Sequence, residues 1–195
     1  SDDEIMIQHS VREFVDKEVA PIIDEHFKNG TFPHELIPQF SGMNLLGVNL
    51  PEEYNCGGMS HVAYGLVCQE LERCDSGIRS FVSVQGSLVM FPIYAYGNED
   101  QRKKWLPKLA SGEAIGCFGL TEPDYGSNPG DMITNAKKTD GGYILNGAKM
   151  WITNGTIADI AVVWAKTEDG VVRGFLVEKG MEGFSAPKMK NKWSL

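Results

Sequence analysis

The sequence lacks the features that mark several classes of protein. No apolar run approaches about 18 residues, so we do not expect the chain to span a membrane. The opening residues SDDEIMIQHS are acidic, whereas a secretory signal peptide opens with basic residues and continues into an apolar stretch. Internal repeats and low-complexity segments are absent as well. With 42% hydrophobic and 23% charged residues, the composition is that of an ordinary globular protein.

Cysteine and histidine are scarce, and neither is arranged as in a metal site. The four cysteines contain no C-x-x-C pair, and the four histidines are scattered without ligand spacing. We therefore expect no metal. Unpaired cysteines in apolar surroundings are typical of reduced core thiols, which favours an intracellular compartment.

Basic residues are outnumbered by acidic ones. The chain has 18 lysines and arginines against 26 aspartates and glutamates, a net charge of -8. Nucleic acid and anionic membrane surfaces attract basic proteins, so neither is expected as the main partner.

Residues 1–112 show the periodicity of helices. A capping-box spacing opens the chain at Ser1, and apolar positions then recur at helical spacing up to Pro21, which marks an end or a kink. Further helices are predicted at residues 34–40, 60–74, 79–96 (kinked at Pro92) and 98–112. The core candidates are Ala63, Val67, Leu71, Cys74, Phe81, Val84, Leu88, Val89, Trp105, Leu106 and Leu109.

After Gly112 the hydrophobic period changes from 3.6 to 2, which predicts strands. The predicted strands cover residues 114–120, 133–138, 143–145, 148–153, 160–166 and 171–177. Helices followed by strands predict an α+β protein with two domains. We expect an all-α helical domain at residues 1–113 and an antiparallel β-barrel or sandwich domain at residues 114–195.

The stretch from residue 116 to residue 154 is the richest in chemical signals. Its first half breaks into a loop with two prolines and two glycines, which would present backbone N–H groups and the hydroxyls of Thr121 and Ser127 to a polar ligand. Its second half predicts a hairpin around Asn146-Gly147, with Trp151 and Thr153 on one strand face. An aromatic ring beside a hydroxyl suits a planar heterocycle, although a core Trp and an ordinary strand Thr fit the pattern too.

The residues of this stretch resemble those of a known family. The segments FGLTEPDYGSNPGDM and LNGAKMWITN resemble the acyl-CoA dehydrogenase family of flavoenzymes. The segments RSFVSVQGSLVMFPIYAYG, IGCFGLTEP and VVRGFLVEKGMEGFSAPK are similar to its glutaryl-CoA branch. The resemblance covers nearly all 195 residues. It implies FAD-dependent α,β-dehydrogenation of an acyl-CoA thioester, electron-transfer flavoprotein as acceptor, a homotetramer, and a bacterial cytoplasm or mitochondrial matrix as location.

The resemblance also implies which residues bind FAD. The Thr121 hydroxyl would meet the pyrimidine edge of the flavin, Thr153 would donate towards its N5 atom, and Ser127 would also meet the CoA substrate. The full implied set is Phe118, Gly119, Leu120, Thr121, Gly126, Ser127, Trp151, Ile152 and Thr153. The loop departs from the family at Asp124-Tyr125 and Asn128, where relatives often have Asn-Ser and Asp. The resemblance therefore does not imply that a specific side chain at these positions binds substrate.

No catalytic residue is assigned within the chain. In the resembled family the base is a Glu in a C-terminal four-helix bundle, which these 195 residues do not contain, so the isolated chain is expected to be inactive. Glu122 lies inside the flavin motif, but it precedes a proline in a loop and is expected to be structural.

A second implied site lies in the helical part. The Arg79-Ser80 pair matches the residues that bind the distal carboxylate in the glutaryl-CoA branch, and Glu72 matches an acidic residue of the same pocket. Alternatively, Arg79 is solvated or paired with Asp75. The substrate is then either glutaryl-CoA, with or without decarboxylation to crotonyl-CoA, or another short acyl-CoA. A third alternative is an inactive binding or interaction fragment.

Overall fold

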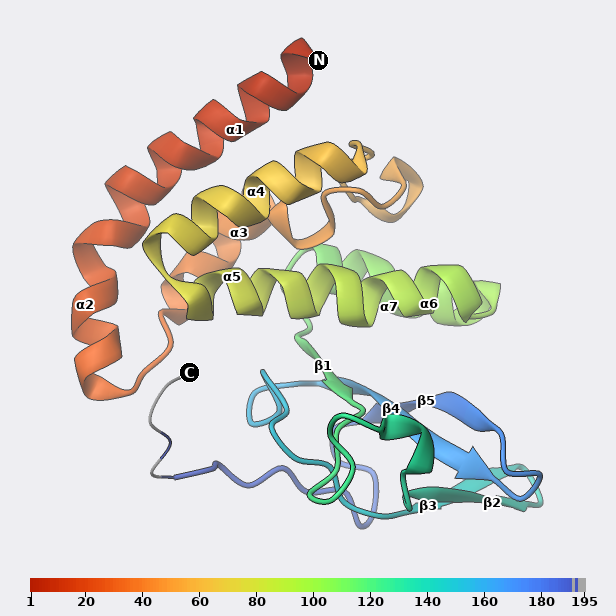
Figure 1. Ribbon diagram of the computed structural model, residues 1–195. Helices are drawn as coiled ribbons and strands as arrows, with labels where there is room; N and C mark the ends of the chain where they lie inside the picture. Colours follow the sequence, from red (N-terminus) through yellow and green to blue (C-terminus); the bar gives the residue numbers. More distant parts are fainter. Residues whose placement is uncertain (191, 193–195) are drawn as a thin grey trace. The chain divides into compact units, whose positions relative to one another are not determined.

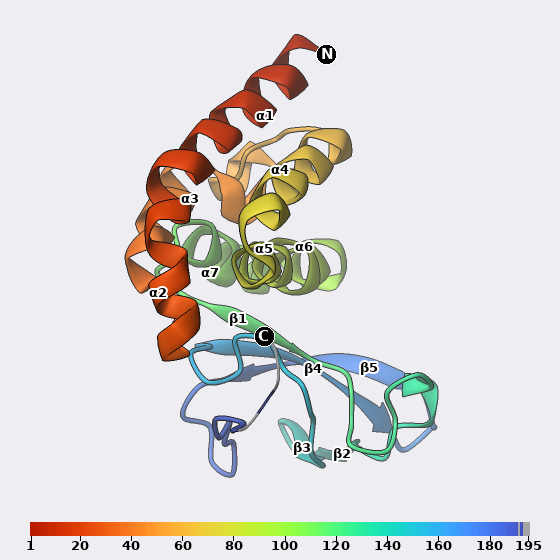
Figure 2. The same ribbon diagram turned by 60° about the vertical axis from the view of Figure 1, so that its left-hand side comes forward.

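The computed structural model describes residues 1–190 and Lys192, and it divides into two compact units. The first unit comprises residues 1–114 with residues 190 and 192, and the second comprises residues 115–189. Figures 1 and 2 show helices in the first unit and a sheet in the second. Residues 191 and 193–195, at the end of the second predicted domain, lie outside the described residues.

The first unit is built from helices. Its α-helices are α1 (Asp2–Phe14), α2 (Ala20–Asn29), α3 (Ile37–Gly42), α4 (His61–Cys74), α5 (Ser76–Ser83), α6 (Phe91–Tyr96) and α7 (Glu99–Ala110). Two π-helical segments, η1 (Val15–Val19) and η5 (Val84–Met90), join α1 to α2 and α5 to α6. The short 3-10 turns are η2 (His34–Leu36), η3 (Leu45–Gly47) and η4 (Glu52–Tyr54).

Side-chain caps begin the longer helices where the sequence predicts them. The Ser60 hydroxyl accepts the N–H of Ala63 at 3.1 Å, and Asn98 forms a capping box with Gln101. The Asp75 carboxylate accepts the N–H of Ile78 at 2.8 Å, so one residue is enough to separate α4 from α5. Gly112, at φ +72°, follows the end of α7 as predicted.

Pro21 and Pro92 each follow a π-helical segment within a continuous helical run. The helix neither ends nor breaks at Pro21, because the wider turn of η1 bonds the Ala20 N–H to the Val15 carbonyl. Pro92 follows η5 in the same way. A proline cannot donate to the carbonyl four residues back, and a π turn removes that requirement.

Aromatic and aliphatic side chains fill the core of this unit. The Phe40 ring lies 5.9 Å from Phe14 and 6.0 Å from Phe81, between centroids. Most predicted core residues are buried, but Leu88 is 39% exposed and Cys74 is half-buried, so both assignments are wrong.

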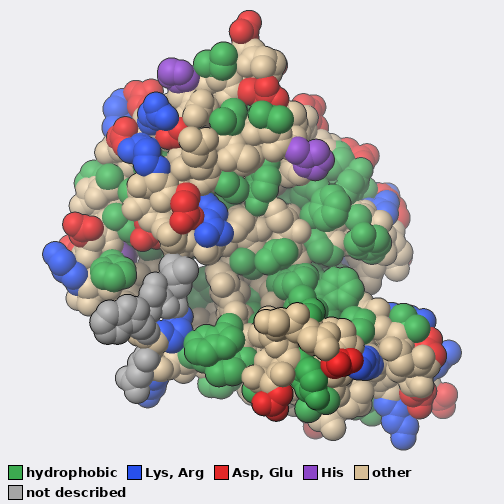
Figure 3. Space-filling view, in the orientation of Figure 1, with side chains coloured by type: hydrophobic (Ala, Val, Ile, Leu, Met, Phe, Trp, Pro, Cys, Tyr) green, Lys and Arg blue, Asp and Glu red, His purple; other side chains and the backbone are tan. Residues whose placement is uncertain are grey.

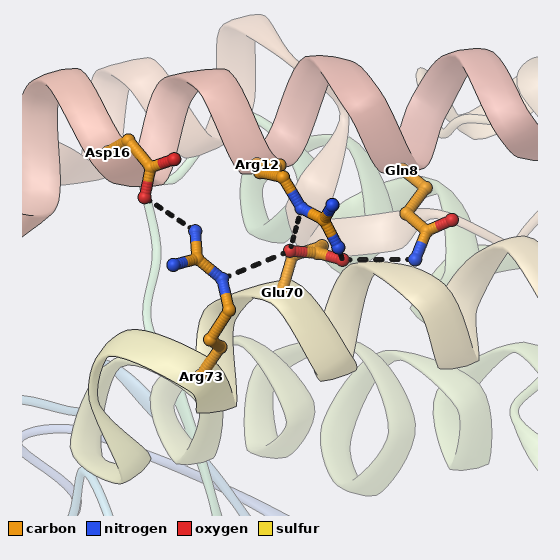
Figure 4. A network of polar contacts seen from close by, with 5 residues as sticks. All are labelled: Gln8, Arg12, Asp16, Glu70 and Arg73. Carbon is orange, nitrogen blue, oxygen red and sulfur yellow. Dashed lines mark hydrogen bonds and ion pairs between the residues drawn. The ribbon is translucent and has the colours of Figure 1, made fainter.

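A buried carboxylate joins α1 to α4, which run side by side (Figures 1 and 4). The Glu70 side chain is 1% exposed. It accepts Arg12 Nη2 at 2.7 Å and Nε at 2.9 Å, Gln8 Nε2 at 3.0 Å and Arg73 Nε at 3.3 Å. Arg73 also donates to Asp16 at 2.5 Å. These bonds hold the pKa of Glu70 at about 2, because the hydrogen bond from Arg12 outweighs the effect of burial.

The remaining charges of the helical unit are mostly exposed, and the two signs are interspersed (Figure 3). They form short local pairs such as Lys17 with Glu13 and Lys103 with Glu99. Exposed pairs of this kind contribute about 0–1 kcal/mol each. The surface therefore carries no single-sign patch in this view.

The second unit contains a mixed sheet. Its strands are β1 (Gly116–Gly119), β2 (Asn135–Thr139), β3 (Gly142–Asn146), β4 (Ile160–Thr167) and β5 (Val172–Glu178). The strand β4 is central: it pairs in parallel with β1 and β2 and antiparallel with β5. The prediction of a β domain is confirmed, but its purely antiparallel pairing is wrong, because β1 and β2 reach β4 through long connections rather than hairpins.

The predicted hairpin around Asn146-Gly147 is wrong. The observed hairpin joins β2 to β3 through Asp140 and Gly141, and residues 148–153 form no strand. Gly147 lies at φ +153°, and a Cβ added there would come within 2.3 Å of the Thr134 hydroxyl oxygen. This close approach turns the chain away from the sheet, and residues 148–154 are then free to reach the loop after β1.

Candidate functional site

The two halves of the 116–154 stretch, which the resemblance assigns to flavin binding, contact each other in the second unit. The N–H of Met150 donates to the Thr121 carbonyl at 2.8 Å, and Asn154 Nδ2 donates to the Gly116 carbonyl at 3.2 Å. These bonds fasten residues 150–154 beside the strand and loop of residues 116–121. Asn154 is absent from the residues that the sequence singles out.

A buried ion pair lies beneath this junction. Lys149 Nζ donates to the Leu120 carbonyl at 3.0 Å and to Glu122 Oε1 at 2.8 Å. Glu122 also accepts the N–H groups of Ile133 at 2.8 Å and Thr134 at 3.0 Å. Burial raises the pKa of Glu122, but the hydrogen bonds from Lys149 and from these peptide groups outweigh it and lower the pKa to about 2. The structural role predicted for Glu122 agrees with these contacts.

Trp151 is exposed and has an unusual backbone conformation. Its φ of 62° lies in the left-handed region, which bulky residues rarely adopt. The residue is 59% exposed. Trp151 and Thr153 therefore do not share a strand face, contrary to the prediction. A strained conformation costs about 1–3 kcal/mol and persists where the surroundings impose it, often at ligand sites. An exposed Trp held in this way is unlike a core residue.

Polar groups near Trp151 are open to a ligand. Within residues 1–190 and 192, the hydroxyls of Thr121, Ser127 and Thr153 have no hydrogen-bond partner. Ser127 and Thr153 are exposed, and Thr121 is half-buried. The loop that carries Thr121 is rigid at its start, since Glu122 and Tyr125 exchange backbone hydrogen bonds at 3.3 Å.

The other residues implied for FAD have mixed positions. The Phe118 ring packs against Trp164 at 5.9 Å, Gly119 is buried against Lys149, and Gly126 is exposed. Leu120 supplies its carbonyl to Lys149, and Ile152 packs on the core cluster of Cys117, Ala158 and Ala161. Phe118 and Ile152 thus have packing roles that would exist without a cofactor.

The donor set fits a flavin. The isoalloxazine ring needs a flat apolar face and hydrogen bonds at a polar edge. The exposed Trp151 ring would supply the flat face, and the hydroxyls of Thr121 and Thr153, which have no hydrogen-bond partner among the described residues, would supply the hydrogen bonds. No further geometry towards the cofactor follows from these residues alone.

The helical unit carries the second candidate site, around Arg79. The Arg79 Nε atom donates to Glu72 Oε2 at 2.5 Å, and Nη1 donates to the Ser83 hydroxyl at 3.3 Å. The Glu72 carboxylate also accepts Ser76 Oγ at 2.6 Å, and hydrogen bonds from Ser76 and Arg79 lower the pKa of Glu72. The alternative pairing of Arg79 with Asp75 is not the one observed, since Asp75 caps α5.

Two serines lie near Arg79, namely Ser80 next to it in the chain and Ser83 one helical turn later. Ser83 lies one turn after Arg79 on the same face of α5 and contacts its guanidinium. Ser80 is half-buried, and its carbonyl accepts the Ser83 hydroxyl at 3.2 Å. The i, i+4 spacing of Arg79 and Ser83 was available in the sequence and signals this contact.

The described part of the chain contains no candidate for a membrane span or for a metal site. None of the helices there combines the length and hydropathy that crossing a bilayer requires. No group of three or more His, Cys, Asp and Glu residues there could hold a metal ion.

Comparisons with known proteins identify what the chain resembles. Residues 1–113 match the family model for the acyl-CoA dehydrogenase N-terminal domain, and residues 117–195 match the model for the middle domain. An acyl-CoA dehydrogenase from Bacillus subtilis (strain 168) is 39% identical over 197 residues, covering 99% of the chain and 52% of the relative. A mitochondrial isovaleryl-CoA dehydrogenase from Pongo abelii is 36% identical over 200 residues, covering 98% and 47%.

Solved structures are similar over the whole chain. A glutaryl-CoA dehydrogenase from Mycobacterium smegmatis, in complex with FADH2, is 53% identical with a TM-score of 0.96 and covers 100% of this chain and 50% of its own. An electron transferring flavoprotein of Acidaminococcus fermentans is 37% identical with a TM-score of 0.93, covering 98% and 52%. The chain spans about half the length of the relatives it matches.

Proposed function

This chain belongs to the acyl-CoA dehydrogenase family, and we propose that the complete protein containing it oxidises an acyl-CoA thioester with FAD as cofactor. The family models and relatives confirm the resemblance that the sequence motifs carry. A structural neighbour that binds FADH2 supports the choice of cofactor. Because the chain spans about half of its relatives, the activity, substrate and partners of the whole protein belong to this proposal.

One observation carries the proposal most strongly. The Met150–Thr121 hydrogen bond joins the two motif segments and leaves a strained, exposed Trp151 beside unengaged hydroxyls. Strained backbone conformations cluster at active sites and ligand clamps, where the surrounding structure holds them in place. A binding site for a flat cofactor would be such a ligand site.

The chemistry divides between the cofactor and the chain. FAD supplies the acceptor for the hydride that leaves the β-carbon of the acyl group. Trp151 would offer a flat surface that excludes water, and Thr121 and Thr153 would donate hydrogen bonds to the polar edge of the ring. Ser127 lies on the same loop and is proposed to meet both the cofactor and the CoA part of the substrate.

The base that removes the α-proton is not assigned to this chain. Glu122 is unsuitable, since its carboxylate is buried, bonded to three donors and held at a pKa of about 2. A general base for this reaction requires a free carboxylate with a pKa nearer to the working pH. The family resemblance leaves this role to a Glu of the C-terminal domain.

We further propose glutaryl-CoA as the substrate, with or without decarboxylation of the product to crotonyl-CoA. Arg79 would bind the distal carboxylate. Ser83 and Glu72 contact its guanidinium, and Ser80 is the next residue in the chain. The Arg79–Glu72 pair has side chains 33% and 45% exposed, so it contributes at most about 1 kcal/mol and can yield to a ligand carboxylate. The alternative substrate is another short acyl-CoA, in which case Arg79 has a structural role. The Arg79–Glu72 ion pair supports that alternative as well.

The partners follow from the relatives. Electron-transfer flavoprotein is the proposed electron acceptor, and a flavoprotein of that name is among the structural neighbours. Relatives of bacterial and mitochondrial origin support the proposed location in a bacterial cytoplasm or mitochondrial matrix. The proposed homotetramer rests on the family resemblance. The division into domains at residues 1–113 and 114–195 remains part of the same proposal.

Flavin spectroscopy on the complete protein tests the cofactor assignment. The purified protein, reconstituted with FAD and desalted, should retain the visible absorbance of bound flavin, and anaerobic glutaryl-CoA should bleach it. A colourless protein that gains no flavin absorbance would contradict the proposal and favour a binding or interaction module.

A further inference from the structure

Lys149 is a buried charge in a stretch that otherwise reaches the surface. Its side chain is 10% exposed, while the neighbouring residues Ala148 and Trp151 are exposed. The Lys149 side chain passes Gly119, where an added Cβ would lie 3.4 Å from Lys149 Cγ. Its charged end therefore lies under the loop that follows β1.

Three acceptors surround the ammonium group. They are the Leu120 carbonyl at 3.0 Å, Glu122 Oε1 at 2.8 Å and the Met132 sulfur at 3.7 Å. An ammonium group has three N–H donors on a compact centre, which matches three separate acceptors. The planar guanidinium of Arg would match a single carboxylate better than this arrangement.

The contacts of Lys149 and Glu122 tie together three segments of the second unit. Lys149 contacts residues 119–122, and Glu122 fixes residues 133–134 through their peptide N–H groups. The next residue, Met150, donates to the Thr121 carbonyl. Consecutive carbonyls, those of Leu120 and Thr121, are thus both held from residues 149–150, one by a side chain and one by the backbone.

Stability alone does not account for this arrangement. Burying two charges costs several kcal/mol in desolvation, and an apolar pair of similar volume would serve packing as well or better. What an apolar pair could not do is hold the Leu120 carbonyl, because it has no donor. The geometry points to a specific task at that peptide.

We propose that Lys149 is a positioning residue for the flavin loop, in that its ammonium group sets the Leu120–Thr121 peptide relative to Trp151. The proposal rests on the proposed flavin function of this surface. Lys149 acts through the backbone and through Glu122, and it does not itself contact the cofactor. Without it, Thr121 loses its fixed direction although the sheet beneath remains.

Two variants of the complete protein test this role. Lys149→Met removes the donor but leaves Glu122 buried without its cation, which also destabilises the fold. The double variant Lys149→Met, Glu122→Gln removes both charges, so no unpaired charge is left buried, while the Leu120 carbonyl still lacks its donor. It should fold with lower stability than wild type, because the Gln amide has one acceptor oxygen for the two peptide N–H groups of Ile133 and Thr134. Lys179→Met is the matched control, because Lys179 pairs with Asp159 at 3.5 Å in the same unit but is 64% exposed.

The measurements are FAD affinity by fluorescence titration, the visible circular dichroism of bound flavin, and thermal unfolding without cofactor. The double variant should unfold below the wild-type temperature but remain folded under the conditions of the titration. There it should bind FAD about tenfold more weakly or worse and show an altered flavin dichroism band. Lys149→Arg should restore part of the affinity, and the Lys179 control should match wild type.

The outcomes separate this proposal from the one on which it rests. Wild-type affinity and dichroism in the double variant would overturn the positioning role alone. Failure of both Lys149 variants to fold would also overturn it, because the pair would then serve the fold rather than the loop. Absence of FAD binding by the wild-type protein would contradict the proposed function itself.

Discussion

Replacing Glu70 by Gln should destabilise the helical unit strongly. Glu70 is 1% exposed and receives hydrogen bonds from Arg12, Gln8 and Arg73 (Figure 4). Its pKa falls from 4.5 to about 2, which corresponds to about 3 kcal/mol of preferential stabilisation of the carboxylate. Glutamine keeps the shape but carries no charge, and its amide N–H groups would face other donors. The free energy of unfolding should therefore fall by about 3 kcal/mol.

Urea unfolding followed by circular dichroism at neutral pH measures this loss. The matched control is Glu13→Gln in α1, the helix that carries Arg12, because Glu13 pairs with Lys17 but its side chain is 65% exposed. That change should leave the stability nearly unchanged, because solvent screens an exposed pair. Equal losses in the two variants would refute the reasoning, because it attributes the stabilisation to burial and to the several donors that Glu70 has and Glu13 lacks.

The same pair of proteins also makes a prediction about pH. The folded pKa of Glu70 lies below its unfolded value, so the carboxylate contributes its full stabilisation above about pH 4.5. That contribution is lost as the pH falls from 4.5 through about 2. The difference in stability between wild type and Glu70→Gln should hold steady from about pH 5 to 8 and shrink in acid. A difference that grows in acid would contradict the sign.

Two further substitutions probe the second unit. Gly147→Ala should cost about 1–3 kcal/mol, because its Cβ would come within 2.3 Å of the Thr134 hydroxyl oxygen, whereas Gly142→Ala, with nothing within 4 Å, should be nearly neutral by thermal unfolding. Equal melting temperatures would show that the chain relaxes around residue 147. Trp151→Asn should leave the protein without cofactor as stable as wild type or up to about 1–3 kcal/mol more stable, since Asn tolerates positive φ, while FAD binding measured by titration falls. Unchanged FAD affinity in this variant would remove Trp151 from the cofactor site.

Local signals explain which parts of the fold could be predicted. The caps at Ser60 and Asn98 act within three residues, so the sequence carries the whole interaction. The strand at residues 160–166 was recognisable from its apolar, β-branched run. The parallel pairing of this strand with β1 could not be predicted, because Gly116 and Ile160 are far apart in the chain. The hydrophobic period identifies a strand but not its partner.

The errors at residues 146–153 have a physical cause as well. Asn-Gly and an alternating pattern favour a hairpin locally, but close packing of Gly147 on Thr134 and the bond from Met150 to Thr121 override that preference. Trp151, the residue after Met150, lies in the left-handed region. No pattern in the sequence predicts this conformation. The motif residues were found through the family resemblance, whereas Lys149 became visible only through its burial.

The helical site shows the same limit. The partner of Arg79 is Glu72, seven residues earlier and on the preceding helix, and the break at Asp75 brings the two together. Sequence spacing within one helix could identify Ser83, but it could not predict a pair across a helix junction.

Substrate discrimination by Arg79 tests the central claim most directly. The measurement is kcat/KM for glutaryl-CoA and for butyryl-CoA, which has no distal carboxylate, in the complete wild-type protein, in Arg79→Ala and in the control Arg173→Ala. Arg173 pairs with Asp169 at 2.8 Å in the other unit. Loss of a charge-assisted contact of about 2–5 kcal/mol predicts that Arg79→Ala lowers the glutaryl-CoA value about 30-fold or more. The butyryl-CoA value should hardly change, and Arg173→Ala should preserve the ratio. An unchanged ratio in Arg79→Ala would contradict the assignment and leave a short-chain acyl-CoA dehydrogenase in which Arg79 is structural.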